Sequence, residues 1–350
     1  MLRLTASMAA FLLITPAAAG AQTPAVSNDP HYLLIDAEST RSRIMRTINV
    51  SKVRERLRDA ADKGFSLLLM STHSRSLNML LRRSTTISAS QRLVAESSES
   101  ALIDELNKAA AEGFRVVPKS IKALDETSMG VTQTMWVAVL AKQSDQLRVK
   151  YSVVKGKKEA EAALTDSSAR GRALVGVLGR QGMAAANIVL FFEEIEETAR
   201  DAPGLQQAEY RVVSAARTSA MQADLAAAAA EGFRVIAAGS GYMTAVMARE
   251  RWVTSNPLEY RLFATHRVGT SVKELQAAGA EGFRIVGTSH NVSEGIFIVE
   301  RLPGTSERFD YEIVQLQEAN TSKVLVGAER DGFRILCLLD DLAVLERQRK

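Results

Sequence analysis

The feature that most constrains this chain is a leucine that precedes a glycine by seven residues, a pair found at six places. The best-preserved copies around the glycine read AAAEGFRVV, AAAEGFRVI, AGAEGFRIV and AERDGFRIL. The glycines are Gly64, Gly113, Gly171, Gly232, Gly282 and Gly332, and the leucines are Leu57, Leu106, Leu164, Leu225, Leu275 and Leu325. The glycines are 49, 58, 61, 50 and 50 residues apart. Such a period indicates one small structural unit used six times.

Each repeated glycine is predicted to end a helix. Glycine takes the left-handed backbone conformation without a Cβ penalty, and this lets the last helical turn close in a Schellman motif. In that motif the residue directly after the glycine packs on the residue four positions before the glycine. Here this pairs Phe283 with Ala278 and Phe333 with Ala328. We therefore expect the repeated leucine, alanine and phenylalanine to be buried and the glycine to have a positive φ.

The residues around each helix predict strands. Phe283 and Ile285 alternate with Arg284 and Val286, a period typical of a strand. A second apolar run follows at 296–299, and a third run precedes the helix at 260–264. The predicted unit is β-α-β-β, and the predicted class is α+β, with six tandem units in mixed sheets that carry helices on one face.

The spacing of the copies predicts the domain organisation. Repeats one to three are expected within 32–195 and repeats four to six within 209–348, joined by a linker at 196–208 that contains Asp201-Ala202-Pro203-Gly204. The third copy is degenerate, because Gly171-Arg172 replaces Gly-Phe. Two triplets and a single body of six units, closed into a ring, both fit this pattern.

Residues 1–21 have the features of a secretory signal peptide. Arg3 supplies the positive charge, 8–14 the short apolar core, and Ala19-Gly20-Ala21 a cleavage site before Gln22. We therefore expect cleavage after Ala21 and a periplasmic or secreted protein with no membrane span.

Composition excludes several function classes. A net charge of +4 is too mild to indicate nucleic-acid binding, and 5% aromatic residues argue against a carbohydrate-stacking surface. The single cysteine, Cys337, allows no internal disulfide. Strand alternation places it on the same face as Phe333 and Ile335, so we expect a buried, unreactive thiol.

At the Glu-Gly-Phe-Arg-Val/Ile cores the sequence resembles a family of short bacterial domains of unknown function. The family signature is a tyrosine in the first strand, a leucine-rich helix ending Ala-Glu-Gly-Trp, then Glu-Leu-Val and a hairpin that ends in a basic residue. Tyr260, Leu275, the segment 280–286 and Val299-Glu300-Arg301 match one whole unit, with phenylalanine for the usual tryptophan and arginine for the usual glutamate. The resemblance implies a β-α-β-β fold and no particular activity.

The arginine after each repeated phenylalanine is the main candidate for a binding site. Arg115, Arg234, Arg284 and Arg334 share one strand position and are predicted to point away from the helix-covered face. If the repeats close into a ring, their guanidinium groups would meet around an axis and bind carboxylates or phosphates. The alternative is that each arginine pairs with an acid on a neighbouring strand, such as Glu300 or Glu346.

The repeats favour a binding role over catalysis, because the recurring positions are core positions. We expect a secreted or periplasmic, non-enzymatic binding or scaffolding protein whose partner is a protein or an acidic small ligand, with no cofactor and no nucleic acid. His73 and His290 lie at equivalent hairpins but no second ligand recurs beside them, so no metal site is predicted. The alternative is a hydrolase-type enzyme with its site near the degenerate third repeat, around Arg172, His73 and the acidic run 193–197.

Overall fold

The computed structural model describes residues 30–38, 48–73, 76–84, 90–128, 131–144, 147–170, 172–180, 187–195, 208–239, 243–250, 257–265, 267–290 and 294–349. The predicted signal peptide with Ala21, the residue Gly171 and residues 196–207 of the predicted linker lie outside these ranges, and Ala208 already begins a strand. Residues His31–Lys350 form one compact unit. No described helix combines the length and the apolar character needed to cross a membrane.

The secondary structure repeats along the chain with the period of the glycines. The helices are α1 (Val50–Asp62), α2 (Glu99–Ala111), α3 (Lys157–Arg170), α4 (Thr218–Ala230), α5 (Val268–Ala280) and α6 (Thr321–Arg330). One strand, here called the leading strand, precedes each helix: β1 (Tyr32–Glu38), β4 (Gln91–Glu96), β8 (Val149–Lys155), β11 (Ala208–Ser214), β14 (Glu259–Thr265) and β17 (Phe309–Gln315).

Two further strands follow each helix. The first, here called the inner strand, is β2 (Phe65–His73), β5 (Phe114–Val116), β9 (Arg172–Arg180), β12 (Arg234–Ala238), β15 (Arg284–His290) or β18 (Arg334–Leu339). The last, here called the middle strand, is β3 (Ser76–Arg83), β7 (Val131–Lys142), β10 (Asn187–Ile195), β13 (Thr244–Glu250), β16 (Gly295–Arg301) or β19 (Leu342–Gln348). Repeat two has one additional strand, β6 (Lys122–Ser128), which pairs with β7. The fold is therefore α+β with repeated units.

Every recorded strand pair is antiparallel, so the prediction of mixed sheets was wrong. The strand order is leading, middle, inner, as in β1-β3-β2 and β14-β16-β15. The helix does connect two parallel strands, but the middle strand returns by a hairpin and inserts between them. The parallel strands consequently never pair.

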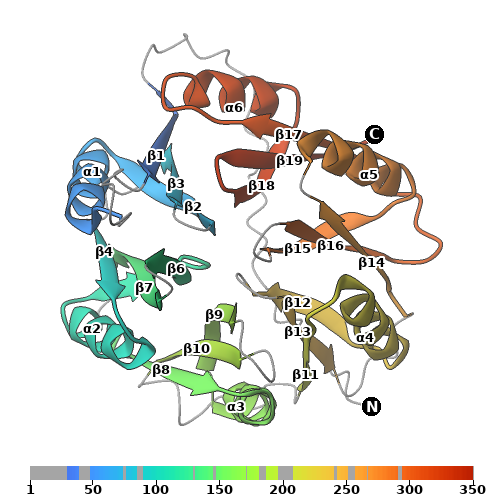
Figure 1. Cartoon of the computed structure of the whole chain (residues 1–350), viewed down its shortest axis with the longest axis horizontal. Helices are drawn as coiled ribbons and strands as arrows, with labels where there is room; N and C mark the ends of the chain where they lie inside the picture. The colour runs from blue at the N-terminus through green and yellow to red at the C-terminus, as the bar shows by residue number, and fades with distance from the viewer. Residues whose placement is uncertain are drawn as a thin grey trace, which may run out of the picture. The chain divides into compact units, whose positions relative to one another are not determined.

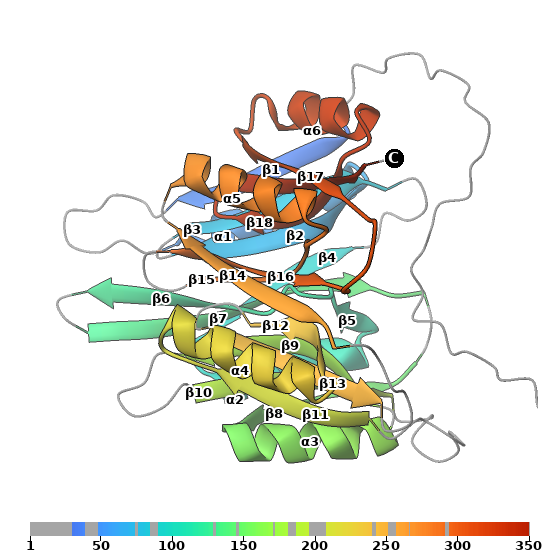
Figure 2. The ribbon, with the colours of Figure 1, turned by 90° about the vertical axis from the view of Figure 1, so that its right-hand side faces the viewer.

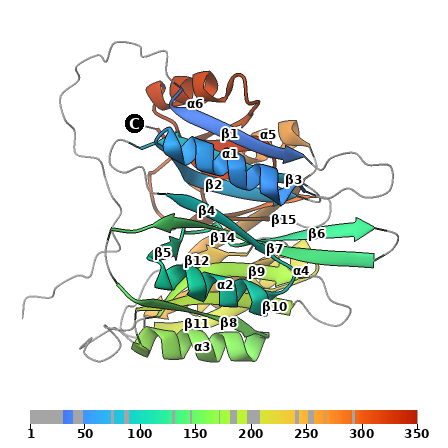
Figure 3. The same cartoon turned by 90° about the vertical axis from the view of Figure 1, so that its left-hand side faces the viewer.

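The repeats contact one another in a closed series. Each helix packs on the leading strand of the next repeat: α1 on β4, α2 on β8, α3 on β11, α4 on β14, α5 on β17, and α6 back on β1. Within His31–Lys350 this series forms a ring with the helices outside and the sheets inside (Figure 1). Side views place α4 and α5 in front of their sheets on one side (Figure 2) and α1 and α2 on the other (Figure 3).

The hydrophobic core follows the same series. Leu225 and Phe233 of repeat four pack in one cluster with Tyr260 and Ile296 of repeat five. A corresponding cluster joins Leu325 and Phe333 of repeat six to Tyr32 and Leu34 of repeat one. Each repeat thus completes the core of its neighbour, as expected for units that cannot bury their apolar faces alone.

The predicted helix ends are confirmed where the structure describes them. All six repeated leucines and the five repeated phenylalanines are buried, and so are Ala60, Ala109, Ala228 and Ala278, whereas Ala328 is only half-buried. Gly64, Gly113, Gly232, Gly282 and Gly332 have φ values between 82° and 94°. In repeat five the amide of Phe283 donates to the carbonyl of Ala278 at 2.9 Å and that of Gly282 to Gly279 at 3.0 Å, which is a Schellman motif.

Candidate functional site

A β-bulge recurs in the inner strands at the fourth residue after the repeated glycine. The register shifts past Leu68 in β2, Ile236 in β12, Val286 in β15 and Leu336 in β18. An extra residue on one strand reverses the faces on which the later side chains lie. After the bulge, the side chains of each of these strands therefore lie on the opposite face of the sheet from the one that simple alternation predicts.

Cys337 shows the consequence, and its predicted orientation was wrong. Ile335 pairs with Leu345 whereas Cys337 pairs with Val344, so these two residues of β18 lie on opposite faces of the sheet. Cys337 is half-buried and lines a central cavity rather than the core beneath α6. Burial raises the pKa of its thiol to about 12, although a hydrogen bond with Thr288 and the charges of Lys119 and Lys122 act in the opposite direction.

The central cavity has a volume of about 680 Å³ and is lined by the inner strands of all six repeats. This volume is within the range of about 300–1,000 Å³ found for small-molecule sites. Its apolar wall consists of Leu69, Met70, Val116, Ile121, Leu174, Val175, Val177, Ile236, Ile285, Val286, Leu336 and Leu338, with smaller residues between them. Ile236 is 50% exposed, so the cavity is open to solvent beside β12.

Small residues bring the inner strands together around this cavity. A Cβ atom added to Gly287 of β15 would lie 2.5 Å from the Cβ of Ala238 of β12, closer than any van der Waals contact. Glycine at 287 is thus required by the approach of two repeats, not by its backbone conformation.

The cavity is asymmetric because repeat two departs from the other copies after the bulge position. Its inner strand ends at Val116, and a loop then leads into β6 and brings Lys119 and Lys122 to the cavity wall. The buried Ser120 holds this loop, because its Oγ donates to the Val139 carbonyl at 2.9 Å and accepts from the Val139 amide at 3.1 Å. Lys119 has a φ of 64°, an uncommon value for a residue with a side chain.

Lys122 is the most perturbed basic group of the cavity. Burial, followed by the positive charge of Lys119, lowers its pKa from 10.5 to about 8, while Cys337 acts weakly in the opposite direction. No ion pair is recorded between Lys122 and any carboxylate in the described part of the chain. Of the described residues that line the cavity, Arg115, Lys119 and Lys122 are cationic and Glu193 is acidic.

Glu193 is already neutralised by other contacts. Its carboxylate pairs with Arg115 and accepts a hydrogen bond from the Tyr151 hydroxyl at 2.7 Å. The same hydroxyl accepts from the Val116 amide at 2.9 Å. The two lysines therefore determine the charge of the cavity.

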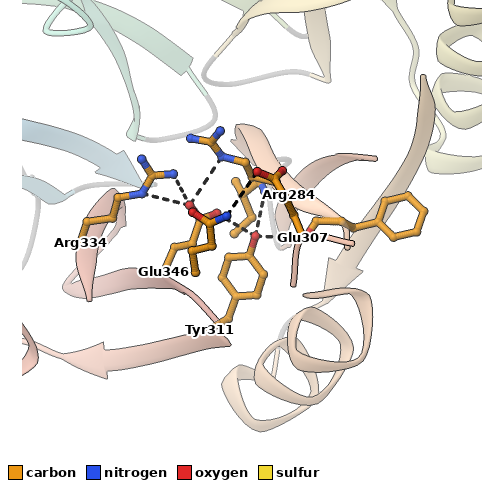
Figure 4. A network of polar contacts seen from close by, with 8 residues as sticks. Arg284, Glu307, Tyr311, Arg334 and Glu346 are labelled. Carbon is orange, nitrogen blue, oxygen red and sulfur yellow. Dashed lines mark hydrogen bonds and ion pairs between the residues drawn. The ribbon is translucent and has the colours of Figure 1, made fainter. Parts of the chain in front are cut away.

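The other predicted arginines also pair with glutamates. Arg234 lies 3.6 Å from Glu300, Arg284 lies 3.5 Å from Glu346, and Nε of Arg334 donates to the same Glu346 at 3.0 Å. Figure 4 shows Arg284 of repeat five and Arg334 of repeat six converging on this buried carboxylate. The anion that these guanidinium groups bind is a side chain of the protein itself.

Sequence reasoning missed the role of the leading-strand tyrosines. Tyr311 donates to Glu346 at 2.8 Å and accepts from the amide of Ile285, in the preceding repeat, at 3.1 Å (Figure 4). Tyr260 does the same with Glu300 at 2.8 Å and the Val235 amide at 2.9 Å. Burial and the adjacent glutamate raise the pKa values of both hydroxyls. The recurrence of tyrosine before the helices was the available signal.

The remaining candidates are not brought together with the cavity lysines. Arg172 is held by Glu194 at 2.8 Å and by Asp166 at 3.5 Å. The side chains of His73 and His290 lie outside the part of the chain that is described, as do Glu196 and Glu197 of the acidic run. Among the described residues no group of acidic, histidine and cysteine side chains is suited to hold a metal ion.

No protein-family model matches this chain, and no curated protein is significantly similar to it. The site must therefore be interpreted from its own geometry and charges.

Proposed function

We propose that this protein binds an apolar small molecule bearing a carboxylate in the cavity at the centre of the ring. The observation that carries the proposal is the half-buried Lys122, which lies with the exposed Lys119 on a cavity that has an aliphatic wall. A buried charge is costly unless an opposite charge accompanies it. A bound carboxylate would supply that charge to both Lys119 and Lys122, and the aliphatic wall would accommodate the apolar body.

The apolar wall and the volume support this ligand class. Small-molecule sites are mostly apolar, with a few polar groups that orient the ligand. An inorganic anion would leave the apolar wall of the cavity in contact with water. A neutral hydrocarbon would leave Lys119 and Lys122 without an opposite charge. A non-enzymatic binding role agrees with a site whose net charge comes from two lysines, since Arg115 and Glu193 pair with each other. Arg172, central to the enzymatic alternative, is held by Glu194 and Asp166.

The proposal is tested by equilibrium binding of decanoate, measured by calorimetry, with decanol as the matched neutral ligand. Removing a hydrogen bond to a charged group costs about 1.5–3 kcal/mol, so Lys122→Met should weaken decanoate binding about 10-fold or more while changing decanol binding little. Lys273→Met on the exposed surface of α5 is the control and should leave both affinities unchanged. Equal decanoate affinity for the parent protein and Lys122→Met would refute the lysine site.

We also propose that the six repeats are copies of one β-α-β-β unit, akin to the short bacterial domains that the sequence resembles, and that β6 is an addition in repeat two. We propose export through cleavage after Ala21, for which mass spectrometry of the mature protein should find Gln22 at the amino terminus. An intact Met1 on the mature protein would contradict export by this route.

A further inference from the structure

We propose that Lys122 is in addition a covalent site, whose amine forms a reversible imine with an aldehyde or ketone held in the central cavity. This inference rests on the proposed function, because the same apolar wall would hold the body of the ligand. It adds a second ligand class, apolar carbonyl compounds, which a purely ionic site would not retain.

The position of Lys122 meets the geometric requirement for such a reaction. It begins β6, directly after the buried Ile121, and lines the cavity together with Lys119 and Cys337. The only acidic side chain among the described lining residues, Glu193, is engaged by Arg115 and Tyr151. The amine is thus presented to an apolar space without a recorded carboxylate partner.

The charge environment makes the amine nucleophilic. A lysine becomes a nucleophile when desolvation or a neighbouring cation removes its proton. Burial and Lys119 lower the pKa of Lys122 to about 8, so about half of the molecules carry a neutral amine at pH 8. By contrast, hydrogen bonding to Glu105 raises the pKa of the exposed Lys108, which therefore stays protonated.

The reaction balances without an oxidant or a cofactor. The neutral Nζ of Lys122 attacks the carbonyl carbon, and the π electrons of the C=O bond move to oxygen. A proton passes from nitrogen to oxygen to give the neutral carbinolamine. Its hydroxyl group then takes up a second proton from solvent and leaves as water, while the nitrogen lone pair forms the C=N bond of the protonated imine. The apolar wall favours this last step, because it limits the water that would reverse it.

Cys337 is the competing nucleophile in the cavity, but its thiol is protonated and therefore unreactive. The thiolate is the reactive form of cysteine, and burial raises the pKa of this thiol to about 12. The thiol therefore stays protonated at the pH at which Lys122 is half neutral.

The test is reductive trapping. The folded protein is incubated at pH 8 with decanal and cyanoborohydride, and every lysine is then mapped by peptide mass spectrometry. We expect the reduced adduct at Lys122 at least 10-fold faster than at Lys108 or Lys273, and we expect excess decanoate to suppress it. Equal labelling of Lys122 and the exposed lysines of the same molecule would overturn the proposal, and this comparison needs no variant.

Lys122→Arg separates the covalent inference from the ionic proposal. Arginine keeps the positive charge but does not form this imine, so the variant should give no adduct at position 122 and should bind decanoate more tightly than Lys122→Met does. Decanoate binding without decanal trapping in the parent protein would overturn only the inference. Loss of decanoate binding in Lys122→Met but not in Lys122→Arg would still support the ionic site.

Discussion

Lys122 illustrates how one residue obtains its properties from the residues around it. Nothing in the segment 118–122 distinguishes this lysine from a solvated surface residue. In the folded protein it faces a cavity whose charged groups are Lys119, Arg115 and Glu193, with the Cys337 thiol nearby. The pKa of its ammonium group therefore falls, and its contribution to the free energy of unfolding depends on pH.

The pH dependence of stability provides a residue-scale prediction. The pKa of Lys122 is about 8 in the folded protein and 10.5 when unperturbed, so the unfolded chain binds more protons between these values. The cost of desolvating the half-buried ammonium group is present below about pH 8 and disappears as the pH rises towards 10.5. Lys122→Met should thus raise the free energy of unfolding by ~1–3 kcal/mol at pH 7, and by progressively less up to pH 10.5.

Urea denaturation at pH 7, 8.5 and 10 measures this change. Lys273→Met, on the exposed side of α5, is the control and should show no such trend. A gain from Lys122→Met that is the same at pH 7 and pH 10 would contradict the lowered pKa.

At the scale of the element, helix and inner strand are joined by a glycine that performs two tasks. In α5 the backbone of Gly282 closes the Schellman motif at a φ of 94°, and the turn places Phe283 between two arginines. The guanidinium carbons of Arg261 and Arg301 lie 4.2 and 4.6 Å from its ring centroid. Sequence reasoning found the apolar contact of this ring but not the two cations that cover it.

Gly282→Ala should lower the free energy of unfolding by at least ~1 kcal/mol, because a Cβ atom is penalised in the left-handed region. The penalty is increased by crowding, since the new Cβ would lie 2.8 Å from the carbonyl oxygen of Glu307. Gly269→Ala is the matched control on the same helix, where φ is not positive and no atom lies within 4 Å. Thermal unfolding should show the control unchanged or more stable by up to ~1 kcal/mol. A Gly282→Ala variant as stable as the parent protein would contradict the role of the left-handed turn.

At the scale of the whole molecule, the ring closes through contacts that resemble those between consecutive repeats but use other residues. Tyr32 donates to Glu329 at 2.5 Å, and Asp340 accepts from Ser76 at 2.5 Å and from Asn78 at 2.8 Å. At three junctions between consecutive repeats, a tyrosine hydroxyl bonds both a glutamate and the preceding repeat's backbone, as Tyr151, Tyr260 and Tyr311 do. Packing of every repeat on two neighbours makes cooperative unfolding of the ring the expected behaviour.

Tyr260→Phe should lower the free energy of unfolding by ~1–3 kcal/mol, because it removes the acceptor of the buried Val235 amide and the hydroxyl donor of Glu300. Tyr210→Phe is the matched control at the equivalent position of repeat four. Tyr210 is partly exposed, and no hydrogen bond of its hydroxyl is recorded with the described residues, so the loss should stay within ~0.5 kcal/mol. Guanidinium denaturation of both variants gives the comparison.

The raised pKa of Tyr260 adds a pH dependence to this prediction. A free tyrosine ionises near pH 10, whereas the hydroxyl in the folded protein stays protonated above that pH, so its contribution is present below about pH 10 and is lost as the pH rises further. The difference between the parent protein and Tyr260→Phe should therefore narrow above pH 10. A difference that is constant up to pH 11 would show that this hydroxyl does not contribute through its proton.

The sequence alone determined the properties that depend on neighbouring residues in the chain. The repeat, the helix ends, the positive φ of Gly282 and the burial of Leu275 follow from local backbone preference and from periodicity, and each was predictable. The antiparallel pairing of the sheets was not predictable, because the order of strands depends on where the hairpin returns. The orientation of Cys337 was not either, since the bulge at Leu336 leaves no mark in the pattern of apolar residues.

Only the tertiary structure decided where the site lies. The cavity is formed by six inner strands that are about 50 residues apart in the chain, so no local pattern encodes its walls. Lys122 lies in the one repeat whose inner strand is interrupted, outside the positions that the repeats share. The pKa of Lys122 is lowered only when ring closure surrounds it with side chains from other repeats. Desolvation depends on all the atoms around a group and not on its neighbours in sequence.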